Sequence, residues 1–368
     1  MSAGIYVHVP FCLTRCGYCD FNAYAGLEHL RGRYVASLIR EAELTAPAWS
    51  DEWFVSVFLG GGTPTMLEAE QLATLLRSLR DVLQVEERAE ITIEANPDTV
   101  NERTLADLLD AGCIRLSMGA QSFDRSVLAA LERVHDPDSV RRAMCDARGA
   151  GYSNVNLDLI YGADGETLAS WERTVEQTIE LAPEHVSAYA LTIEPSTALG
   201  RKVQAGVVPG PDPDLQADMF ELACLRLADA GYRHYEVSNW AKPGFECAHN
   251  LGYWQRRPYL GLGAGAHSFR DDRRWWNVRP PQEYLANVEA GRLPVGGDEL
   301  LEPAEAHLEE VFLRLRILEG VPTSSVDPSV STPFIESGLL RHDDGALVPT
   351  ERGMLVLNEL VLALADQP

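Results

Sequence analysis

Short apolar runs alternate along the first half of the chain with longer segments in which apolar residues recur every three or four positions. Six of the short runs read as β-strands, at residues 5–9, 55–59, 90–94, 114–118, 154–160 and 185–191. Helical periodicity marks the segments between them, including residues 68–84, 102–111, 138–149 and 167–181. Because strands that alternate with helices form parallel sheets, this order predicts a six-fold βα repeat in an α/β fold.

Six βα units are too few for a closed barrel, which takes about eight. The pattern therefore predicts a partial, TIM-like (β/α)6 barrel whose open side can admit a large substrate. In barrels of this kind the functional residues gather at the carboxyl ends of the strands. Chemistry-bearing side chains are therefore expected in the loops that follow the strands.

The last part of the chain shows a different order of elements. It predicts an amphipathic helix at 303–318, a shorter helix at 328–337, a hairpin that turns at Asp344 and Gly345, and a final helix at 350–365. This order is typical of a small α+β, winged-helix-like domain, which we expect to cover the barrel or to dock a protein. The chain thus divides into a barrel core, an aromatic-rich connecting segment and a C-terminal domain, at residues 1–238, 239–300 and 301–368.

Composition limits the partners. The formal net charge is −24, and residues 301–368 carry four Arg and no Lys against twelve acidic residues. A nucleic acid needs a basic face, so no nucleic-acid partner is expected. The sequence contains no run of about 18 consecutive apolar residues, so no membrane-spanning segment is predicted. Residues 1–20 lack the pattern of a secretory signal, which predicts a cytoplasmic location and reduced thiols.

Three of the seven cysteines, Cys12, Cys16 and Cys19, lie in the string CLTRCGYC directly after the first predicted strand. A cubane of four irons and four sulfides normally takes four thiolates, so three thiolates leave one iron free for another chelator. A structural zinc site is the alternative, and it would need a fourth Cys or His at ligand spacing. The other four cysteines are scattered singly, at Cys113, Cys145, Cys224 and Cys247.

The Cys-X3-Cys-X2-Cys string resembles the signature of radical S-adenosylmethionine (SAM) proteins. The resemblance implies a 4Fe-4S cluster held by the three thiolates, with SAM on the free iron. The second strand runs into Gly60, Gly61, Gly62, Thr63 and Pro64. Glycines there let backbone amides approach a ligand, although a tight turn alone would explain them. GGGTP resembles the family's segment that holds the amino-acid moiety of SAM.

Polar residues also stand where packing would favour apolar ones, at or near the ends of later strands: Glu94, Gln121, Arg133 and Asp158. Any single one could be structural, for example as a buried carboxylate paired with an arginine. Together their types and order resemble the SAM-contacting residues of the oxygen-independent coproporphyrinogen III oxidase superfamily. Tyr6 and Tyr18, beside the cysteine loop, match the same pattern.

Residues 240–284 are rich in aromatic side chains: Trp240, Tyr253, Trp254, Tyr259, Phe269, Trp275, Trp276 and Tyr284. Such a segment is by default core, but it also offers the flat surface that a macrocycle needs. An imidazole can supply an axial nitrogen to heme iron, which makes His249 a candidate. Arg256 and Arg257 could pair with propionates, and Cys247 and His267 are rival iron ligands.

The string HNLGYW at residues 249–254 resembles the His-Asn-X-X-Tyr-Trp heme-binding motif of the HemW-type heme chaperones. Two departures separate the chain from the coproporphyrinogen oxidases that it also resembles. Phe21 stands where those oxidases carry a fourth cysteine, and Met1 lies only eleven residues before Cys12, where they carry a longer arm. Both departures weaken the oxidase interpretation, and the HNLGYW string and Phe21 favour the chaperone.

The resemblance implies heme, SAM and a 4Fe-4S cluster as bound groups, with heme passed to respiratory and other acceptor proteins. It further implies an electron donor such as a flavodoxin or ferredoxin, peripheral contact with membrane proteins, and a homodimer. Two alternatives stay open. One is an oxygen-independent coproporphyrinogen III dehydrogenase, and the other is a radical SAM enzyme with a different substrate whose aromatic segment is ordinary core.

Overall fold

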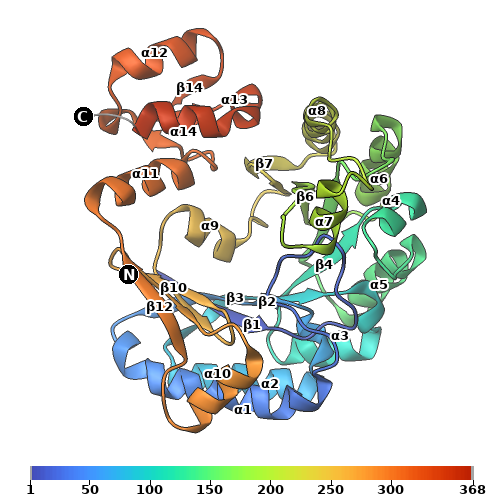
Figure 1. Ribbon diagram of the computed structural model, residues 1–368, viewed down its shortest axis with the longest axis vertical. Helices are drawn as coiled ribbons and strands as arrows, with labels where there is room; N and C mark the ends of the chain where they lie inside the picture. Colours follow the sequence, from blue (N-terminus) through green and yellow to red (C-terminus); the bar gives the residue numbers. More distant parts are fainter. Residues whose placement is uncertain (1, 366–368) are drawn as a thin grey trace.

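The computed structural model describes residues 2–365, in which twelve strands form one curved sheet (Figure 1). The strand order is β12-β11-β10-β9-β1-β2-β3-β4-β5-β6-β8-β7. Its centre is parallel and consists of β1 Ser2–Val9, β2 Trp53–Gly61, β3 Val85–Ala95, β4 Arg115–Gln121, β5 Val155–Tyr161 and β6 His185–Ala190. Each central strand overlaps one of the six predicted runs, so the sequence pattern of the partial barrel is confirmed.

Helices follow each central strand on the outside of the sheet. The four predicted helices are present as α2 Ala69–Val82, α3 Glu102–Asp110, α5 Pro137–Ala150 and α6 Leu168–Glu180. The others in this part are α1 Arg31–Thr45, α4 Arg125–Ala130, α7 Ala198–Gln204 and α8 Pro213–Asp229. Side-chain caps fix several starts, as when Asn101 accepts from the Thr104 amide and Thr167 from the Ser170 amide.

Additional strands, which the sequence pattern did not predict, extend both edges of the sheet. They are β7 Arg233–Glu236, β8 Asn239–Ala241, β9 Tyr259–Leu262, β10 His267–Arg270, β11 Arg273–Asn277 and β12 Val295–Leu300. β9 runs parallel to β1, whereas β10, β11 and β12 continue in antiparallel order. The sheet therefore ends in antiparallel edges and does not close into a barrel.

Two helices of the connecting segment lie on opposite faces of this sheet: α9 Ala248–Trp254 and α10 Pro281–Glu289. α10 packs against α1 on the outside, together with the other barrel helices. α9 contacts β1 and β2 and lies on the face away from α1 and α2 (Figure 1). The HNLGYW string is thus helical and is held against the inner face of the sheet.

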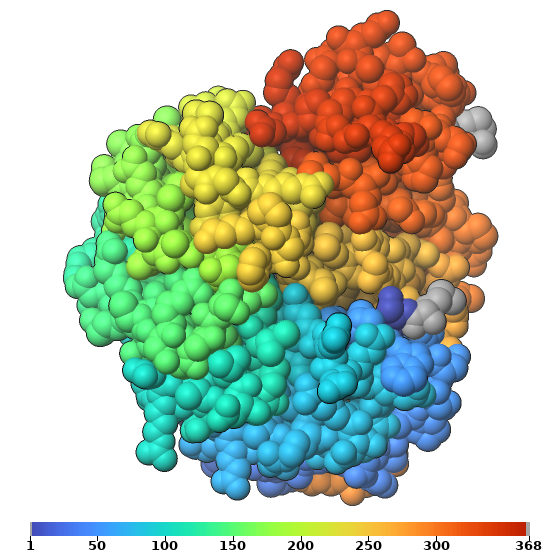
Figure 2. Space-filling view, turned by 180° about the vertical axis from the view of Figure 1, so that it is seen from behind, coloured from blue at the N-terminus to red at the C-terminus, as the bar shows by residue number. Residues whose placement is uncertain are grey.

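The C-terminal elements follow the predicted order with two differences. They are α11 Pro303–Arg314, β13 Val321–Pro322, α12 Pro328–Glu336, β14 Leu340–Asp343, β15 Ala346–Pro349, α13 Glu351–Leu355 and α14 Leu357–Ala365. The short strand β13 adds a third member to the hairpin, and the final helix is broken at Val356. Buried apolar residues form a separate cluster here, and the elements project as a lobe in Figure 2. The proposed boundaries at residues 238 and 300 stay predictions.

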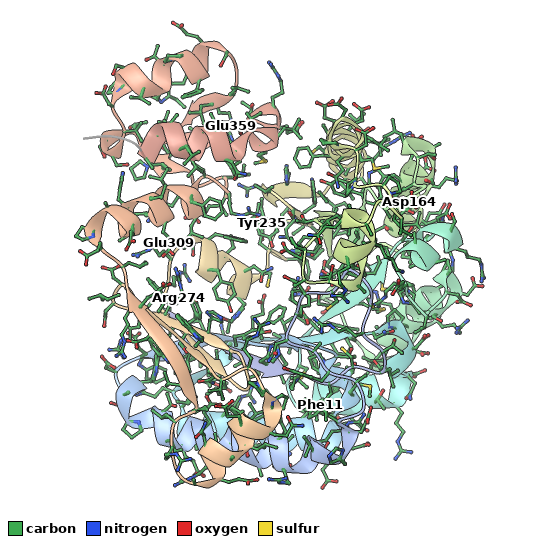
Figure 3. All side chains as sticks on the ribbon, in the orientation of Figure 1. Phe11, Asp164, Tyr235, Arg274, Glu309 and Glu359 are labelled. Atoms are coloured by element: carbon green, nitrogen blue, oxygen red, sulfur yellow. The ribbon has the colours of Figure 1, made fainter. Side chains whose placement is uncertain are left out.

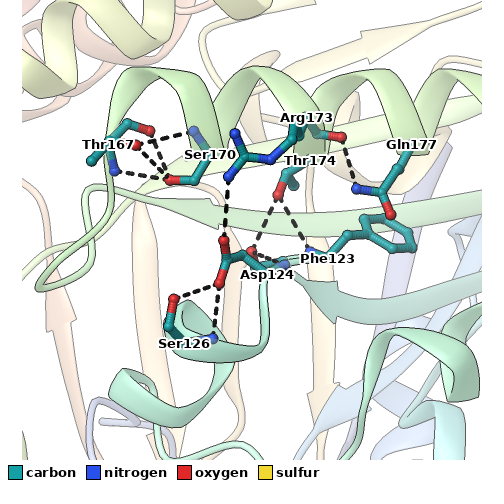
Figure 4. Close-up of polar contacts among 9 residues, drawn as sticks. Phe123, Asp124, Ser126, Thr167, Ser170, Arg173, Thr174 and Gln177 are labelled. Atoms are coloured by element: carbon teal, nitrogen blue, oxygen red, sulfur yellow. Dashed lines mark hydrogen bonds and ion pairs between the residues drawn. The ribbon is translucent and has the colours of Figure 1, made fainter.

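The loop after β4 is fixed to α6 by hydrogen bonds (Figure 4). The Thr174 hydroxyl accepts from the backbone amide of Phe123 at 3.3 Å, and Asp124 pairs with Arg173 at 3.7 Å. These contacts hold the turn that begins at Gln121, whose φ of 63° is unusual for a residue with a side chain. Gln121 is the last residue of β4 and therefore lies at the carboxyl edge of the sheet.

A buried carboxylate connects the edge strands to the barrel. Glu41 of α1 accepts hydrogen bonds from the Gly263 amide at 2.8 Å, the Asn277 side chain at 2.6 Å and the Tyr284 hydroxyl at 2.7 Å. Burial, opposed by these hydrogen bonds, raises the pKa of Glu41 to about 7. The folded protein therefore binds the Glu41 proton more tightly than the unfolded chain does.

This difference predicts a pH-dependent contribution to stability. The free energy of unfolding should fall by about 3 kcal/mol as the pH rises from about 4.5 to 7, because the ionised group is favoured in the unfolded chain. Glu41→Gln should remove this component, measured as the difference between wild type and variant in urea unfolding across that range. Glu43→Gln, at an exposed residue of the same helix, is the matched control. If the difference in unfolding free energy between wild type and Glu41→Gln does not change with pH over this range, the assignment is wrong.

Within the described residues, no helix combines the length and apolar character needed to cross a membrane.

Candidate functional site

A cavity of about 420 Å³ lies at the carboxyl ends of the central strands. Most of the residues singled out in the sequence line it together. They are Cys12, Cys16, Tyr18, Cys19, Gly61, Gly62, Thr63, Glu94, Gln121, Arg133 and Asp158. They come from the ends of five strands and the loops that follow them, so the parallel sheet brings separate sequence positions into one site.

The cysteine loop leaves β1 and is held against the glycine turn after β2. The Gly62 amide donates to the Val9 carbonyl at 2.9 Å, and the Thr63 amide donates to the Phe11 carbonyl at 2.7 Å. The Thr63 hydroxyl lies 3.7 Å from Cys12 Sγ. The GGGTP segment therefore supports the loop that carries the three thiols.

Glycine is required at two positions of this turn. Gly61 has a φ of 109°, and an added Cβ would lie 2.4 Å from the His8 ring. A Cβ at Gly62 would lie 2.6 Å from the Phe11 carbonyl oxygen. A side chain at Gly61 would collide with His8 of β1, and one at Gly62 would collide with the start of the cysteine loop. These glycines therefore allow a close backbone approach as well as a turn.

The donor set fits an iron-sulfur cluster with an open position. Three thiols from one short loop face the cavity, and among residues 2–365 no histidine and no fourth cysteine lines it. A closed zinc site would require that fourth ligand. Burial raises the pKa of the Cys12 and Cys19 thiols, so cluster binding must displace their protons.

Arg133 places a positive charge beside the thiols. Its Nη1 lies 3.4 Å from Cys16 Sγ, and its Nη2 donates to the Gly119 carbonyl at 3.2 Å. The side chain belongs to the loop after α4, but these contacts direct it into the cavity. A cation in this position offsets the negative charge of thiolate sulfurs.

Two half-buried carboxyl groups, Glu94 and Asp158, also line the cavity. Glu94 accepts from the Gly61 amide at 3.1 Å, and burial together with the nearby Asp158 raises the pKa of Glu94 to about 8. Burial also raises the pKa of Asp158, which accepts from the Ser117 hydroxyl at 2.9 Å. A ligand that brings a cation or hydroxyl donors would relieve this concentration of acidic groups.

Asp158 also ends a buried hydrogen-bond network that reaches α9. The Cys247 amide lies 3.3 Å from the Tyr235 hydroxyl, which lies 2.7 Å from His185 Nε2. His185 Nδ1 lies 2.6 Å from Asn156 Oδ1, and Asn156 Nδ2 donates to Asp158 at 2.9 Å. Tyr235 marks this network near the centre of Figure 3.

A second cavity, of about 580 Å³, adjoins the first and shares Asp20 and Phe21 with it. Tyr6 lines this second cavity and not the first, with its hydroxyl 3.1 Å from His8 Nδ1. His249 lines neither of the two, because α9 holds its ring against β2.

Tyr189 is a cavity residue that the sequence reasoning missed. It lies near the end of β6 and lines the first cavity beside Asp158. The available signal was a large polar aromatic side chain at the carboxyl end of the sixth predicted strand. Asn96 and Thr99, which follow β3, line the same cavity and were missed as well.

Of the two candidate propionate partners, Arg256 is engaged in ion pairs elsewhere, and Arg257 lines neither of the two large cavities. Arg256 pairs with Asp272 at 2.8 Å and with Glu309 at 3.0 Å. Arg274 also pairs with Glu309, and Figure 3 labels both residues. These ion pairs connect the edge of the sheet to α11. The rival ligand Cys247 is buried, with its Sγ 3.5 Å from Glu90.

Comparisons with known proteins agree with the fold and the site. Residues 6–178 match the radical SAM superfamily model, and residues 301–356 match the HemN C-terminal domain model. The solved structure of Escherichia coli coproporphyrinogen III oxidase HemN is similar, with a TM-score of 0.86 and 25% identity over 99% of this chain and 90% of that one. Fold and site together define a protein of the radical SAM superfamily.

Relatives of nearly the same length narrow this class. The heme chaperone HemW of Mycobacterium tuberculosis is 42% identical over 98% of this chain and 94% of its own length. Heme chaperone HemW of Escherichia coli is 36% identical over 98% of both chains. The chain belongs to the HemW family.

The cluster assignment makes a direct prediction. Cys16→Ala should remove a thiolate ligand, so anaerobically reconstituted protein should lose most of its iron and sulfide and its reduced 4Fe-4S electron paramagnetic resonance signal. Cys145→Ala, at an exposed cysteine far from the loop in sequence, is the matched control and should keep both. Full iron and sulfide loading in Cys16→Ala would contradict the three-thiolate site.

Proposed function

We propose that this chain is a heme chaperone, which binds heme and a SAM-coordinating 4Fe-4S cluster and delivers heme to acceptor proteins. The observation that carries the proposal is the nearly full-length similarity to proteins named heme chaperone HemW. The structure supports it with a large second cavity beside the cysteine loop, separate from the first cavity but sharing Asp20 and Phe21 with it.

The first cavity offers a set of residues for the cluster and SAM. Cys12, Cys16 and Cys19 would hold the cluster, and the turn at Gly61 and Gly62 would offer backbone groups to the methionine end of SAM. A cluster of this kind, when bound, supplies electrons to SAM. The chain's own contribution is to position these groups and to shield them from water.

The remaining residues of the first cavity have complementary roles in this proposal. Arg133 would offset the cluster's negative charge from its place beside Cys16. Glu94 and Asp158 would accept from the ammonium and ribose hydroxyl groups of SAM. Tyr18 and Gln121 would close the sides of the ligand site. Tyr6, which lines the second cavity, would form part of the wall between the SAM site and the heme site.

Coproporphyrinogen III oxidation is the second candidate, because the chain resembles the Escherichia coli oxidase over its full length. At 25% identity this similarity is lower than that to the heme chaperones. Phe21, in place of a fourth cysteine of the loop, also favours heme carriage. The two functions differ in outcome, since a chaperone releases its porphyrin unchanged.

The proposal includes the setting in which the protein works. It places the protein in the cytoplasm, with respiratory proteins as heme acceptors and with peripheral contact with membrane proteins. A flavodoxin or ferredoxin would be the electron donor to the cluster. A homodimer would place two such sites in one assembly. The C-terminal domain, which projects from the barrel, is the proposed docking surface for an acceptor (Figure 2).

Two measurements on the same protein separate the candidates. Hemin titrated into reconstituted protein should give a saturable Soret band, while iron-free protoporphyrin IX serves as the control ligand. Coproporphyrinogen III incubated anaerobically with the protein, SAM and a reductant should be recovered unchanged. Absence of a hemin-dependent band would contradict the chaperone, and conversion of propionates to vinyl groups would establish the oxidase.

A further inference from the structure

The second cavity is shaped by aromatic side chains from the cysteine loop, α9 and the edge strands. Its lining includes Phe21, Tyr253, Tyr259, His267, Trp276 and Arg279. The Phe21 side chain is 61% exposed, although phenylalanine is among the residues most often buried in proteins. An exposed aromatic ring between two cavities offers a surface for a flat ligand.

His249, the histidine of HNLGYW, is poorly placed to ligate an iron. It is 3% exposed, its Nδ1 lies 2.9 Å from the Ser56 hydroxyl and its Nε2 lies 3.0 Å from the Tyr253 hydroxyl. Its ring also stacks on Phe58, with the ring centres 5.2 Å apart. The opening beside it measures about 10 Å³, so a macrocycle could reach it only if α9 moved away from the sheet.

His267 has the opposite surroundings. It begins β10, is exposed, and lines the second cavity. Within residues 2–365 neither of its ring nitrogens makes a hydrogen bond, while its ring stacks on Trp276 at 5.7 Å. Partial burial and the nearby Arg274 and Arg279 lower the pKa of His267, so the imidazole is neutral at pH 7 and keeps a free lone pair.

Arg279 adds a cation at the same cavity. Its backbone carbonyl accepts from Asn22 at 2.9 Å, which fixes the residue beside the cysteine loop. In the described part of the chain its guanidinium pairs with no carboxylate. An unpaired arginine in a chain of net charge −24 is suited to a propionate, which it can bind through two hydrogen bonds.

We propose that His267, whose ring is supported by Trp276, ligates the heme iron in the second cavity, with the macrocycle beside Phe21 and a propionate at Arg279. His249 is then a positioning residue that holds Tyr253 in the cavity wall. The inference rests on the proposed function, because it assumes that the carried ligand is a ferric porphyrin with acidic side chains. The sequence analysis made His249 the candidate iron ligand and His267 a rival, whereas this proposal assigns the iron to His267.

The test compares hemin binding by His267→Gly and His249→Ala, with the exposed His342→Ala in the C-terminal hairpin as control. Loss of the axial nitrogen should weaken hemin binding by about tenfold or more, since even indirect partners of a metal ligand contribute that much. His267→Gly should also shift the Soret band and change the ferric electron paramagnetic resonance signal. Added imidazole should restore both in His267→Gly, because it can occupy the vacated space.

His249→Ala should keep the wild-type ferric signal with a modest loss of affinity, and His342→Ala should match the wild type. Far-ultraviolet circular dichroism and iron loading of the cluster show whether each variant is folded. If wild-type protein binds hemin and His267→Gly keeps its affinity and spectra, the ligand assignment is wrong although the chaperone stands. If the wild type gives no hemin-dependent band, the proposed function itself fails, and the ligand assignment with it.

Discussion

Strand β1 is the constraint on which both cavities depend. It pairs in parallel with β2 on one side and with β9 on the other, in a register that sets Tyr6 opposite Phe58 and Gly261. The cysteine loop leaves this strand at its carboxyl end, so the loop is placed between the βα repeat and the antiparallel edge. One face of the loop meets the first cavity and the other meets the second. The pairing thereby brings residues more than 200 positions apart around one short segment.

The parallel centre could be predicted because each buried strand is a short β-rich run and each helix shows its own periodicity. Cys12, Gly61 and Asp158 could likewise be placed together, since the carboxyl ends of parallel strands meet at one edge. The edge strands could not. β11, with the sequence RRWWN, and β12, with VGGDEL, are charged or glycine-containing, and their strand conformation depends on pairing with distant segments. The final helix also breaks at Val356, where φ is −121° and ψ is 33°, although neither a glycine nor a proline stands at that position.

The HNLGYW string shows what a motif leaves undetermined. Residue types and spacing indicate that this segment matters, but they do not say which side of a helix faces a ligand. In the structure Glu90 accepts from the Ala248 amide at 3.2 Å and the His249 amide at 3.3 Å, which fixes the start of α9 over the sheet. That orientation buries His249 and turns Tyr253 toward the second cavity. Sequence reasoning weighed His267 only as a rival, because nothing in the string GAGAHSF marks its exposure.

The network between Cys247 and Asp158 can have only one direction. Burial lowers the pKa of His185 well below its usual value, so the ring is neutral and carries one proton. Asn156 Oδ1 accepts that proton from Nδ1, so Nε2 accepts from the Tyr235 hydroxyl, which in turn accepts from the Cys247 amide. The amide of Asn156 is then oriented with its nitrogen toward Asp158. Asp158 is consequently an acceptor before any ligand arrives, and its remaining lone pairs select for molecules that present hydroxyl or ammonium hydrogens. Hydrogen bonds thus connect the acceptor in the first cavity to the start of α9, the helix that borders the second cavity.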